Sequence, residues 1–370
     1  MGHFDTIVVG VGGMGSAACY QLARRGKTVL GIEAHTIAHD RGSSHGQTRL
    51  IRRAYFESSD YIPLLNRSYE LWRQIEEESK TQLFVQNGLL MIGNPERGGE
   101  AIRGTLESAK AYQIPVERLS PAALRERFPR FSAAPDDIGA FEKGAGFLWV
   151  ERAVEAHARR ARELGAEIRE GCQVLNLVAS GNEVVVETDQ GSHSGGSVVI
   201  TAGPWSSQIL ADPELPLSVH RVVQCWFESS LTEIPCFAFD HPPHFLYGFP
   251  ALPGLGLKAA LHQPGPAVND PGRVDRAIHA EDTEPLAALL HQRLPSVPNP
   301  VSRATTCLYT MTPDGHFIVD KHRIFPNTYF ATGFSGHGFK FASVMGEILA
   351  DLAISGETHL PIDFLRANRF

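Results

Sequence analysis

The feature of this sequence that most constrains its fold is a glycine pattern near the N-terminus, Gly10-x-Gly12-x-x-Gly15. A short apolar run from Thr6 to Val9 precedes it, and a stretch with apolar residues at helical spacing follows it. Glycines at this spacing allow a tight turn, a close approach of the backbone to a diphosphate, and close packing of helix on strand. Amide groups at the helix start would then face the diphosphate. The pattern predicts a strand, turn and helix that bind a dinucleotide.

A second strand-like run, KTVLGIEA, carries Glu33 at the spacing of about 20 residues expected for the ribose-binding carboxylate of such a unit. A carboxylate there also disfavours a 2′-phosphate, and therefore NADP. The alternative is a chance glycine turn followed by an unrelated surface glutamate. The glycine pattern alone does not separate NAD from FAD.

Patterns of helix, glycine and strand recur at both ends and in the centre of the chain, and strand-rich segments with many Pro and Gly lie between them. A chain of 370 residues is long enough for two domains. We expect a mixed α/β (α+β) fold, in which a Rossmann-like cofactor-binding domain of discontinuous segments carries an inserted, β-sheet-rich substrate domain. The predicted segments are 1–80, 150–215 and 305–370 for the first and 81–149 and 216–304 for the second.

The composition of the chain indicates which kinds of binding partner are not expected. The 34 basic and 41 acidic residues give a net charge of −7, which offers no reason to expect nucleic acid or membrane. No apolar stretch approaches the roughly 18 residues of a membrane span. The five cysteines form no CxxC pair, so that we expect neither disulfides nor a metal site. Without a signal-peptide pattern, we expect a cytoplasmic protein.

Several cations occur where the chain is otherwise apolar. Arg49, Arg52 and Arg53 follow the small residues of HDRGSSHG, and a buried guanidinium needs a partner. That partner is either solvent or an anionic cofactor or substrate. Lys258 lies in an apolar strand-like run, where it either reaches the surface or is a buried functional group. His262, taken alone, is more often a structural histidine.

Two stretches near the C-terminus remain to be explained. In NTYFATGFSGHGFKF, a predicted strand from Tyr329 to Thr332 leads through glycines into a helix whose N-terminus suits an electron-rich group. Lys340 in its first turn opposes the helix dipole, which a nearby anion would explain. In TTCLYTMTPDGHF, Cys307 in a β-branched run is either buried filler or a reactive group.

Taken together, the sequence resembles the monomeric sarcosine oxidase and N-methyltryptophan oxidase group of the D-amino-acid-oxidase-like flavoproteins. The matching stretches are the glycine pattern, SSHGQTRLIR, YGFPALPGLGLK, CLYTMTPDGHFIVD and GFSGHGFKF. They span nearly the whole chain in the same order. The stretches around Cys307 and from Gly333 to Phe341 are much more specific than the glycine pattern.

The resemblance implies FAD attached covalently to the sulfur of Cys307. It also implies catalytic roles for Lys258, which would activate O2, and for Arg49, His262 and Tyr309. The substrate, an N-alkyl amino acid, would be bound by Arg52, Lys340, Tyr247, His262 and Phe56. The residues expected at the cofactor are Gly10, Gly12, Gly13, Met14, Gly15, Glu33, Ala34, Ser43, Ser44, Arg49, Val174, Ala202, Gly203, Cys307, Met311, Gly333, Ser335, Gly336, His337, Gly338 and Lys340.

The activity implied is oxidation of a secondary amine by hydride transfer to the flavin, with O2 reduced to H2O2 and the imine hydrolysed to formaldehyde and an amino acid. We expect a monomer. Phe56 stands where a small residue is expected, and Gly315 where the group usually has an acidic one. Phe56 therefore leaves the substrate open, with a cyclic amine such as pipecolate or proline as the alternative. An NAD-linked dehydrogenase and a non-catalytic flavin-binding redox protein are the alternatives of other classes.

Overall fold

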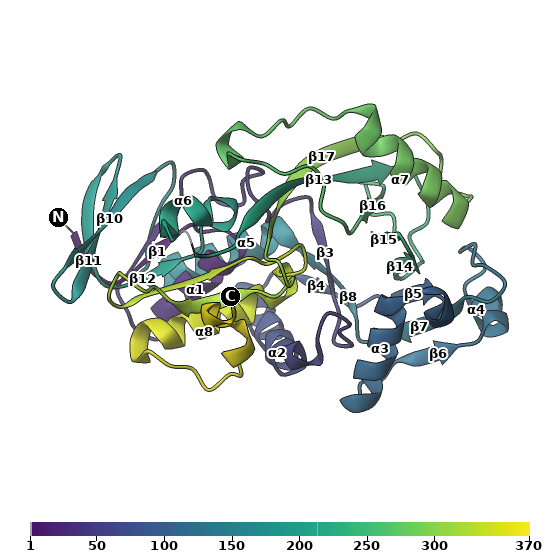
Figure 1. Ribbon diagram of the computed structural model, residues 1–370, viewed down its shortest axis with the longest axis horizontal. Helices are drawn as coiled ribbons and strands as arrows, with labels where there is room; N and C mark the ends of the chain where they lie inside the picture. The colour runs from purple at the N-terminus through teal and green to yellow at the C-terminus, as the bar shows by residue number, and fades with distance from the viewer. Residues whose placement is uncertain (1, 213) are drawn as a thin grey trace.

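The computed structural model describes residues 2–212 and 214–370. Two large sheets lie toward opposite ends of an elongated molecule, and a small sheet lies between them (Figure 1). We call the sheet that contains the N-terminal strand sheet I, the other large sheet sheet II, and the small one sheet III. Among the residues described, no helix has the length and apolar character needed to cross a membrane.

Sheet I has a parallel core that begins with the predicted strand before the glycine turn. The run from Thr6 to Val9 is buried throughout, as expected for a parallel strand covered on both faces. The strand order is β10-β11-β12-β1-β2-β9, and β12 also pairs with β19, which pairs with β18. The strands are β1 (Gly2–Val9), β2 (Val29–Ile32), β9 (Glu167–Arg169), β10 (Val174–Ser180), β11 (Glu183–Thr188), β12 (Gly191–Ile200), β18 (Ile318–Lys321) and β19 (Thr328–Thr332).

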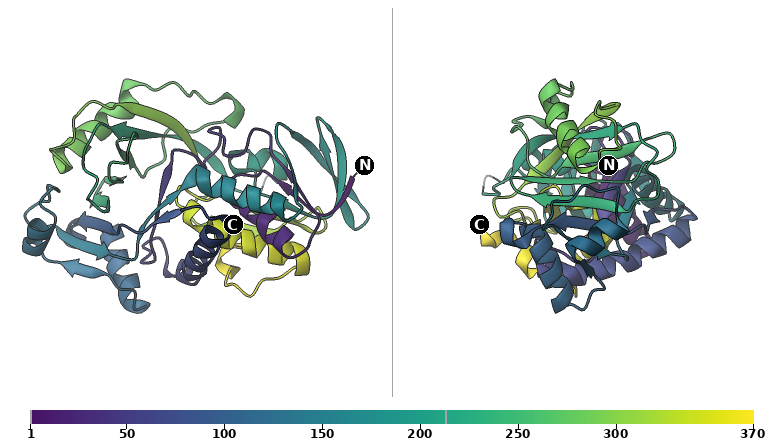
Figure 2. Two further views of the ribbon diagram at one scale, coloured as in Figure 1. Left: turned by 180° about the vertical axis from the view of Figure 1, so that it is seen from behind. Right: turned by 90° about the vertical axis from the view of Figure 1, so that its right-hand side faces the viewer.

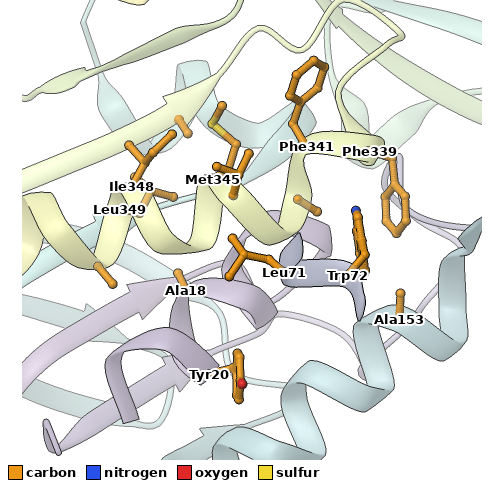
Figure 3. Packing of buried hydrophobic residues seen from close by; sticks show 14 of the residues in the cluster. Ala18, Tyr20, Leu71, Trp72, Ala153, Phe339, Phe341, Met345, Ile348 and Leu349 are labelled. Atoms are coloured by element: carbon orange, nitrogen blue, oxygen red, sulfur yellow. The ribbon is translucent and has the colours of Figure 1, made fainter. Parts of the chain in front are cut away.

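Four helices pack together beside sheet I: α1 (Gly13–Arg24), α2 (Ile62–Ser79), α5 (Val150–Glu163) and α8 (Ala342–Ser355). Figure 3 shows side chains of α1, α2, α5 and α8 gathered in this core, and the view from behind shows α5 crossing in front of α1 (Figure 2). The backbones of α1 and α8 approach closely at Gly346, where an added Cβ would lie 2.5 Å from the carbonyl carbon of Ala17. This packing fixes the start of α1 relative to the segment before α8.

Sheet II has the order β17-β13-β16-β15-β14-β5-β7-β6. Only the pair of β14 and β5 is parallel among these neighbours. The strands are β5 (Leu89–Gly93), β6 (Glu117–Leu119), β7 (Ile138–Glu142), β13 (Ser218–Phe227), β14 (Cys236–His241), β15 (His244–Gly248), β16 (Leu257–Leu261) and β17 (Arg303–Met311). Helices α3 (Glu100–Ala111), α4 (Pro121–Arg127) and α7 (Ala280–Arg293) pack against it.

Sheet III joins the two ends with β3 (Thr48–Ile51), β8 (Gly146–Trp149) and β4 (Phe84–Val85). Short helical segments complete the fold: η1 (Ser59–Tyr61), η2 (Pro95–Arg97), η3 (Gly203–Trp205), α6 (Ser206–Leu210), η4 (Pro271–Arg273), η5 (Phe339–Phe341), η6 (Asp363–Leu365) and η7 (Ala367–Arg369).

The predicted fold class, a mixed α/β fold with a Rossmann-like part and a sheet-rich part, is confirmed. One strand lies in a different sheet from the other strands of its predicted segment. The strand that carries Cys307, β17, was expected within the cofactor-binding segment 305–370, but it pairs along its length with β13 and so belongs to sheet II. The reason is that its β-branched residues find an antiparallel partner in β13 from the substrate segment. The predicted domain boundaries themselves stay a prediction.

Candidate active site

One cavity of about 640 Å³ runs from the glycine turn after β1 to the segment around Lys340. Residues of sheet I line one end of it, and residues of sheet II and of the segment from 49 to 57 line the other. Its size is typical of a site for a small molecule or cofactor. We call the two parts the glycine end and the cationic end.

The glycine end is formed by backbone. Gly10 has φ +84°, a conformation that favours glycine, and an added Cβ would lie 2.7 Å from the carbonyl oxygen of Thr201. A Cβ at Gly15 would clash with the carbonyl oxygen of Gly10, so that glycine is needed where α1 meets β1. A Cβ at Gly12, by contrast, would meet only the hydroxyl of Ser44, at 3.8 Å. Gly12 therefore exposes its backbone to the cavity, as a diphosphate cradle requires.

Glu33 follows β2 directly and lines the same end. Its carboxylate accepts hydrogen bonds from the amides of Val11 at 2.9 Å and His35 at 3.0 Å, and lies 3.3 Å from Nε2 of His39. Burial alone would raise the pKa of Glu33, but His39 and these amides outweigh it and lower the pKa. The residue is thus a fixed carboxylate at the position predicted for binding ribose hydroxyls.

Cys307 lies in a cationic environment between the two ends. Nη2 of Arg49 is 3.5 Å from its sulfur and also donates to the carbonyl of Ser43 at 2.9 Å. Burial would raise the pKa of Cys307, yet the neighbouring His45 and Arg49 outweigh it and lower the pKa to about 6. At neutral pH the sulfur is therefore largely a thiolate, which is the nucleophilic form.

Lys258 is 3% exposed and lies behind the cavity wall on β16. Its Nζ donates to the carbonyl oxygens of Gly46 at 2.6 Å and Thr48 at 2.9 Å. Burial lowers the pKa of Lys258 well below its usual range, and the positive charge of Arg49 lowers it further. The first of the two sequence alternatives, a lysine that reaches the surface, is therefore wrong.

At the cationic end, Arg52 is held by a bidentate ion pair with Glu57, with Nη2 to oxygen distances of 2.9 and 2.8 Å. Its guanidinium also lies 4.4 Å from the ring centroid of Tyr55 and 4.3 Å from that of Phe56. Burial would raise the pKa of Glu57, but Arg52 dominates and lowers it to about 2. Arg52 is therefore buried together with a carboxylate partner, as expected for a guanidinium in an apolar stretch.

Lys340 lies in η5 and lines the same end. Its Nζ donates to the carbonyl of His337 at 2.5 Å and to the hydroxyl of Tyr55 at 3.4 Å. Its own carbonyl accepts hydrogen bonds from Nε1 of Trp72 at 2.9 Å and the hydroxyl of Ser68 at 2.5 Å, so that α2 anchors the segment. Burial, and next the charge of Arg52, lower the pKa of Lys340 to about 7.

Aromatic and histidine side chains complete the cationic end. The hydroxyl of Tyr309 lies 3.4 Å from Nδ1 of His262, and Tyr247 lines the cavity beside them. Burial lowers the pKa of His262 to about 4, so that the imidazole is neutral at neutral pH. The part of the cavity beside Arg52 and Lys340 can therefore bind a small anion. The uncharged part of that anion would face the neutral rings of His262, Tyr309 and Tyr247.

A family model described as an FAD dependent oxidoreductase matches residues 5–352 of the chain. The chain belongs to this family of FAD-dependent oxidoreductases. The family predicted from the sequence is thereby confirmed.

Relatives match over almost the whole length. The monomeric sarcosine oxidase of Streptomyces avermitilis is 37% identical over 377 residues, which cover 99% of this chain and 97% of that protein. The N-methyl-L-tryptophan oxidase of Salmonella dublin is 36% identical over 374 residues, 99% of each. The structure of NikD, an unusual amino acid oxidase essential for nikkomycin biosynthesis, in its open form has a TM-score of 0.88 at 25% identity, over 99% of this chain and 98% of that one.

The glycine end fits FAD. Gly12 leaves room for the diphosphate, and Glu33 would hold the adenosine ribose. The segment from Gly333 to Gly338, Arg49 and Lys340 line the same cavity and would hold the ring system. Gly12 and Glu33 come from the first 33 residues and the segment from Gly333 to Gly338 from the last 40, yet all of them line the same cavity.

Of the residues predicted for the site, all line the cavity except Gly15, Lys258, Cys307 and Met311. Gly15 packs α1 onto β1, Lys258 donates to the carbonyls of Gly46 and Thr48, and Cys307 contacts Arg49, which does line the cavity. Met311 is half-buried on β17, two residues beyond Tyr309, and its contact with the cofactor stays a prediction.

Sequence reasoning missed His45, Glu57, Tyr55 and Gln224. His45 and Gln224 both act on the cysteine region, the first beside the sulfur and the second by accepting from Nη1 of Arg49 at 3.1 Å. His45 lies within SSHGQTRLIR, so its position in a matching stretch was an available signal. Gln224 lies 175 residues from Arg49, and only the fold brings the two together.

Proposed function

We propose that the protein oxidises N-methyl amino acids, with O2 as electron acceptor and H2O2 as product. The observation that carries this proposal is the pair of buried cations, Arg52 and Lys340, which line the same cavity as the glycine cradle but at its other end. Arg52 stays charged at every ordinary pH and Lys340 titrates near neutral pH, and both can donate hydrogen bonds to a carboxylate ligand. The sarcosine and N-methyltryptophan oxidases, which are similar over the full chain, support the same substrate class.

Binding of the substrate carboxylate competes with a group already present. Glu57 accepts both Nη2 contacts of Arg52 in the structure, so that an incoming carboxylate shares or replaces this partner. Lys340 then supplies a second cation that Glu57 does not pair with directly. The same two cations lower the pKa of the substrate nitrogen, which favours the neutral amine from which hydride can leave. His262, neutral at pH 7, adds no further positive charge beside the amine.

When bound, FAD supplies the electron acceptor for the amine and passes the electrons to O2. The chain contributes Lys258 to the oxygen step. Its lowered pKa lets it take up a proton as negative charge develops on oxygen nearby, which stabilises that charge. The carbonyls of Gly46 and Thr48 hold Nζ in place for this role.

We also propose that Cys307 binds FAD covalently. The carbon–sulfur bond would join Sγ to the 8-methyl carbon of the flavin, the thiol and the methyl group would each lose a hydrogen, and O2 would leave as H2O2. Support comes from the pKa of about 6 for Cys307 and from the positions of His45 and Arg49. Acid-precipitated wild-type protein should stay yellow, and Cys307→Ala should release its colour into the supernatant. A colourless wild-type pellet would contradict the attachment.

A peroxide-coupled screen of the purified yellow protein tests the main proposal. We expect H2O2 with at least one of sarcosine, N-methylalanine and N-methyltryptophan, and little with glycine. Faster turnover of pipecolate or proline would instead establish the cyclic-amine alternative. This alternative arises because the large side chain of Phe56 lines the cavity where a small residue is expected. No peroxide with any secondary amine would favour a non-catalytic flavin protein.

A further inference from the structure

The cationic end of the cavity has an apolar floor. Leu89 and Met91 on β5, Ala238 on β14 and Phe245 on β15 all line the cavity from sheet II, and we call these four residues the floor. Met91 pairs in register with Ala238, which pairs with Tyr247, so that their side chains form a row across one face of the sheet. The small Ala238 between two large neighbours leaves a recess in this row.

A single ring connects the floor to the carboxylate site. The centroid of Phe56 lies 4.3 Å from the guanidinium carbon of Arg52 and 5.5 Å from the ring centroid of Phe245. Helix α3 packs closely against the start of this side chain, because an added Cβ at Gly104 would lie 3.0 Å from Cβ of Phe56. A ligand anchored at Arg52 that extends along Phe56 therefore reaches Phe245 and the recess at Ala238.

The floor differs chemically from the part of the cavity lined by Arg52 and Lys340. Leu89, Met91, Ala238 and Phe245 carry no hydrogen-bonding side-chain N or O atom, whereas the wall around Arg52 and Lys340 is charged. This division gives one surface for a carboxylate and a separate one for hydrocarbon. A ligand with a charged group over the floor would lose hydration without gaining a partner.

We propose, on the basis of the function proposed above, that the floor binds the substrate side chain, so that the preferred substrates are N-methyl amino acids with an apolar side chain of about leucine or phenylalanine size. Sarcosine, which has no side chain, would leave the floor uncovered. Each methylene buried there is expected to raise kcat/KM by about fourfold. Leucine-sized substrates should therefore exceed sarcosine by about tenfold or more.

The first test compares kcat/KM for sarcosine, N-methyl-L-leucine, N-methyl-L-phenylalanine and N-methyl-L-glutamate on the holoenzyme. We expect the two apolar substrates to exceed sarcosine by about tenfold or more, and N-methyl-L-glutamate to fall below them by a similar factor. A preference for sarcosine or for N-methyl-L-glutamate would overturn the proposal. Peroxide from sarcosine alone would leave the proposed function standing and refute only the floor.

Variants locate the effect. Ala238→Met fills the recess and should lower the ratio of kcat/KM for N-methyl-L-leucine over sarcosine at least tenfold. Met91→Ala enlarges the recess and should shift preference from N-methyl-L-leucine toward N-methyl-L-phenylalanine. Ala260→Met is the matched control, because Ala260 pairs with Tyr247 in the same row but does not line the cavity, and it should leave the ratios unchanged. Ratios that stay constant in Ala238→Met and Met91→Ala would refute the subsite.

A binding measurement separates the floor from turnover. The holoenzyme is titrated with acetate, 4-methylpentanoate and pentanedioate, and the change in flavin absorbance gives each Kd. We expect 4-methylpentanoate to bind at least tenfold more tightly than either of the others, and Ala238→Met to remove this advantage. If no amine were oxidised, the proposed function would be wrong and this titration would still decide the floor. Equal Kd values would overturn it.

Discussion

The two ends of the cavity are built by different means. At the glycine end, the shape of the cavity is set by backbone conformation and by the absence of side chains at Gly10, Gly12 and Gly15. At the cationic end, buried charged side chains such as Arg52 and Lys340 are held by partners from distant segments. The first end is specified by local geometry, and the second depends on long-range contacts that set charge and pKa.

This difference predicts different kinds of failure. A side chain added at the glycine end fills space that the backbone or the cofactor needs, so that we expect it to impair folding or to lower the FAD content. A substitution at the cationic end changes charge, so that its effect is on one step or one ligand. The following predictions test this contrast.

The largest effect is expected at Gly15. Gly15→Ala places a Cβ against the carbonyl oxygen of Gly10 and within 2.6 Å of the hydroxyl of Thr201, so that α1 must move off β1. We expect little or no soluble FAD-bound protein, since overpacking typically costs about 1–3 kcal/mol and here meets backbone. Gly12→Ala is the matched variant, because its Cβ meets only Ser44 at 3.8 Å. It should fold with a normal melting temperature as apoprotein but bind less FAD. If both variants folded equally well and bound FAD equally, the proposed difference between Gly15, which packs α1 onto β1, and Gly12, which faces the cavity, would be wrong.

The glycine end could be predicted from sequence because each requirement is local. Gly10 to Gly15 and Glu33 lie within one strand, turn, helix and strand, and the structure places them as expected. The cationic end was predicted in part, through charged residues in apolar stretches and through family resemblance. Its partners were not predicted: Glu57 follows Phe56 with no pattern that links it to Arg52, and Gln224 is contributed by another sheet.

A second prediction concerns Lys258, for which we propose a role in the reaction with O2. Lys258→Met keeps the length of the side chain and removes the group that donates to Gly46 and Thr48. We expect reoxidation of the reduced flavin by O2 to slow by about 10²–10³-fold, as for loss of one preorganised charge-stabilising donor. Anaerobic reduction by substrate, measured by stopped-flow absorbance, should change far less. Equal slowing of both half-reactions would show that Lys258 supports the site generally and has no specific role with oxygen.

A third prediction separates binding from structure at Arg52. Arg52→Gln removes a charged hydrogen-bonding partner, and we expect the Kd of a substrate carboxylate to rise about 10- to 100-fold. The variant also leaves the Glu57 carboxylate buried without its main partner, which lowers thermal stability. The double variant Arg52→Gln, Glu57→Gln should recover stability while its Kd stays weak. Recovery of both properties together would mean that the ion pair positions the loop and that Arg52 does not bind the carboxylate.

The smallest expected effect is a pH dependence at Lys340. Its pKa of about 7 means that the ammonium is present below neutral pH and is lost as the pH rises through about 7. The affinity for a carboxylate should therefore be highest below pH 7 and fall above it, by at most about tenfold per pH unit. Flavin absorbance titrations with 4-methylpentanoate between about pH 6 and pH 9 would measure this profile.

Two variants decide whether Lys340 is the titrating group. Lys340→Arg keeps a cation at every pH in this range, because a guanidinium does not deprotonate there, and should bind with a flat profile. Lys340→Met should also be flat, but weaker at low pH. Since the charge of Arg52 is the second cause of the lowered pKa, Arg52→Gln should move the midpoint of the Lys340 profile to higher pH. A midpoint that stays fixed in Arg52→Gln would show that the two cations do not influence one another, and the cationic end would then consist of two independent contacts.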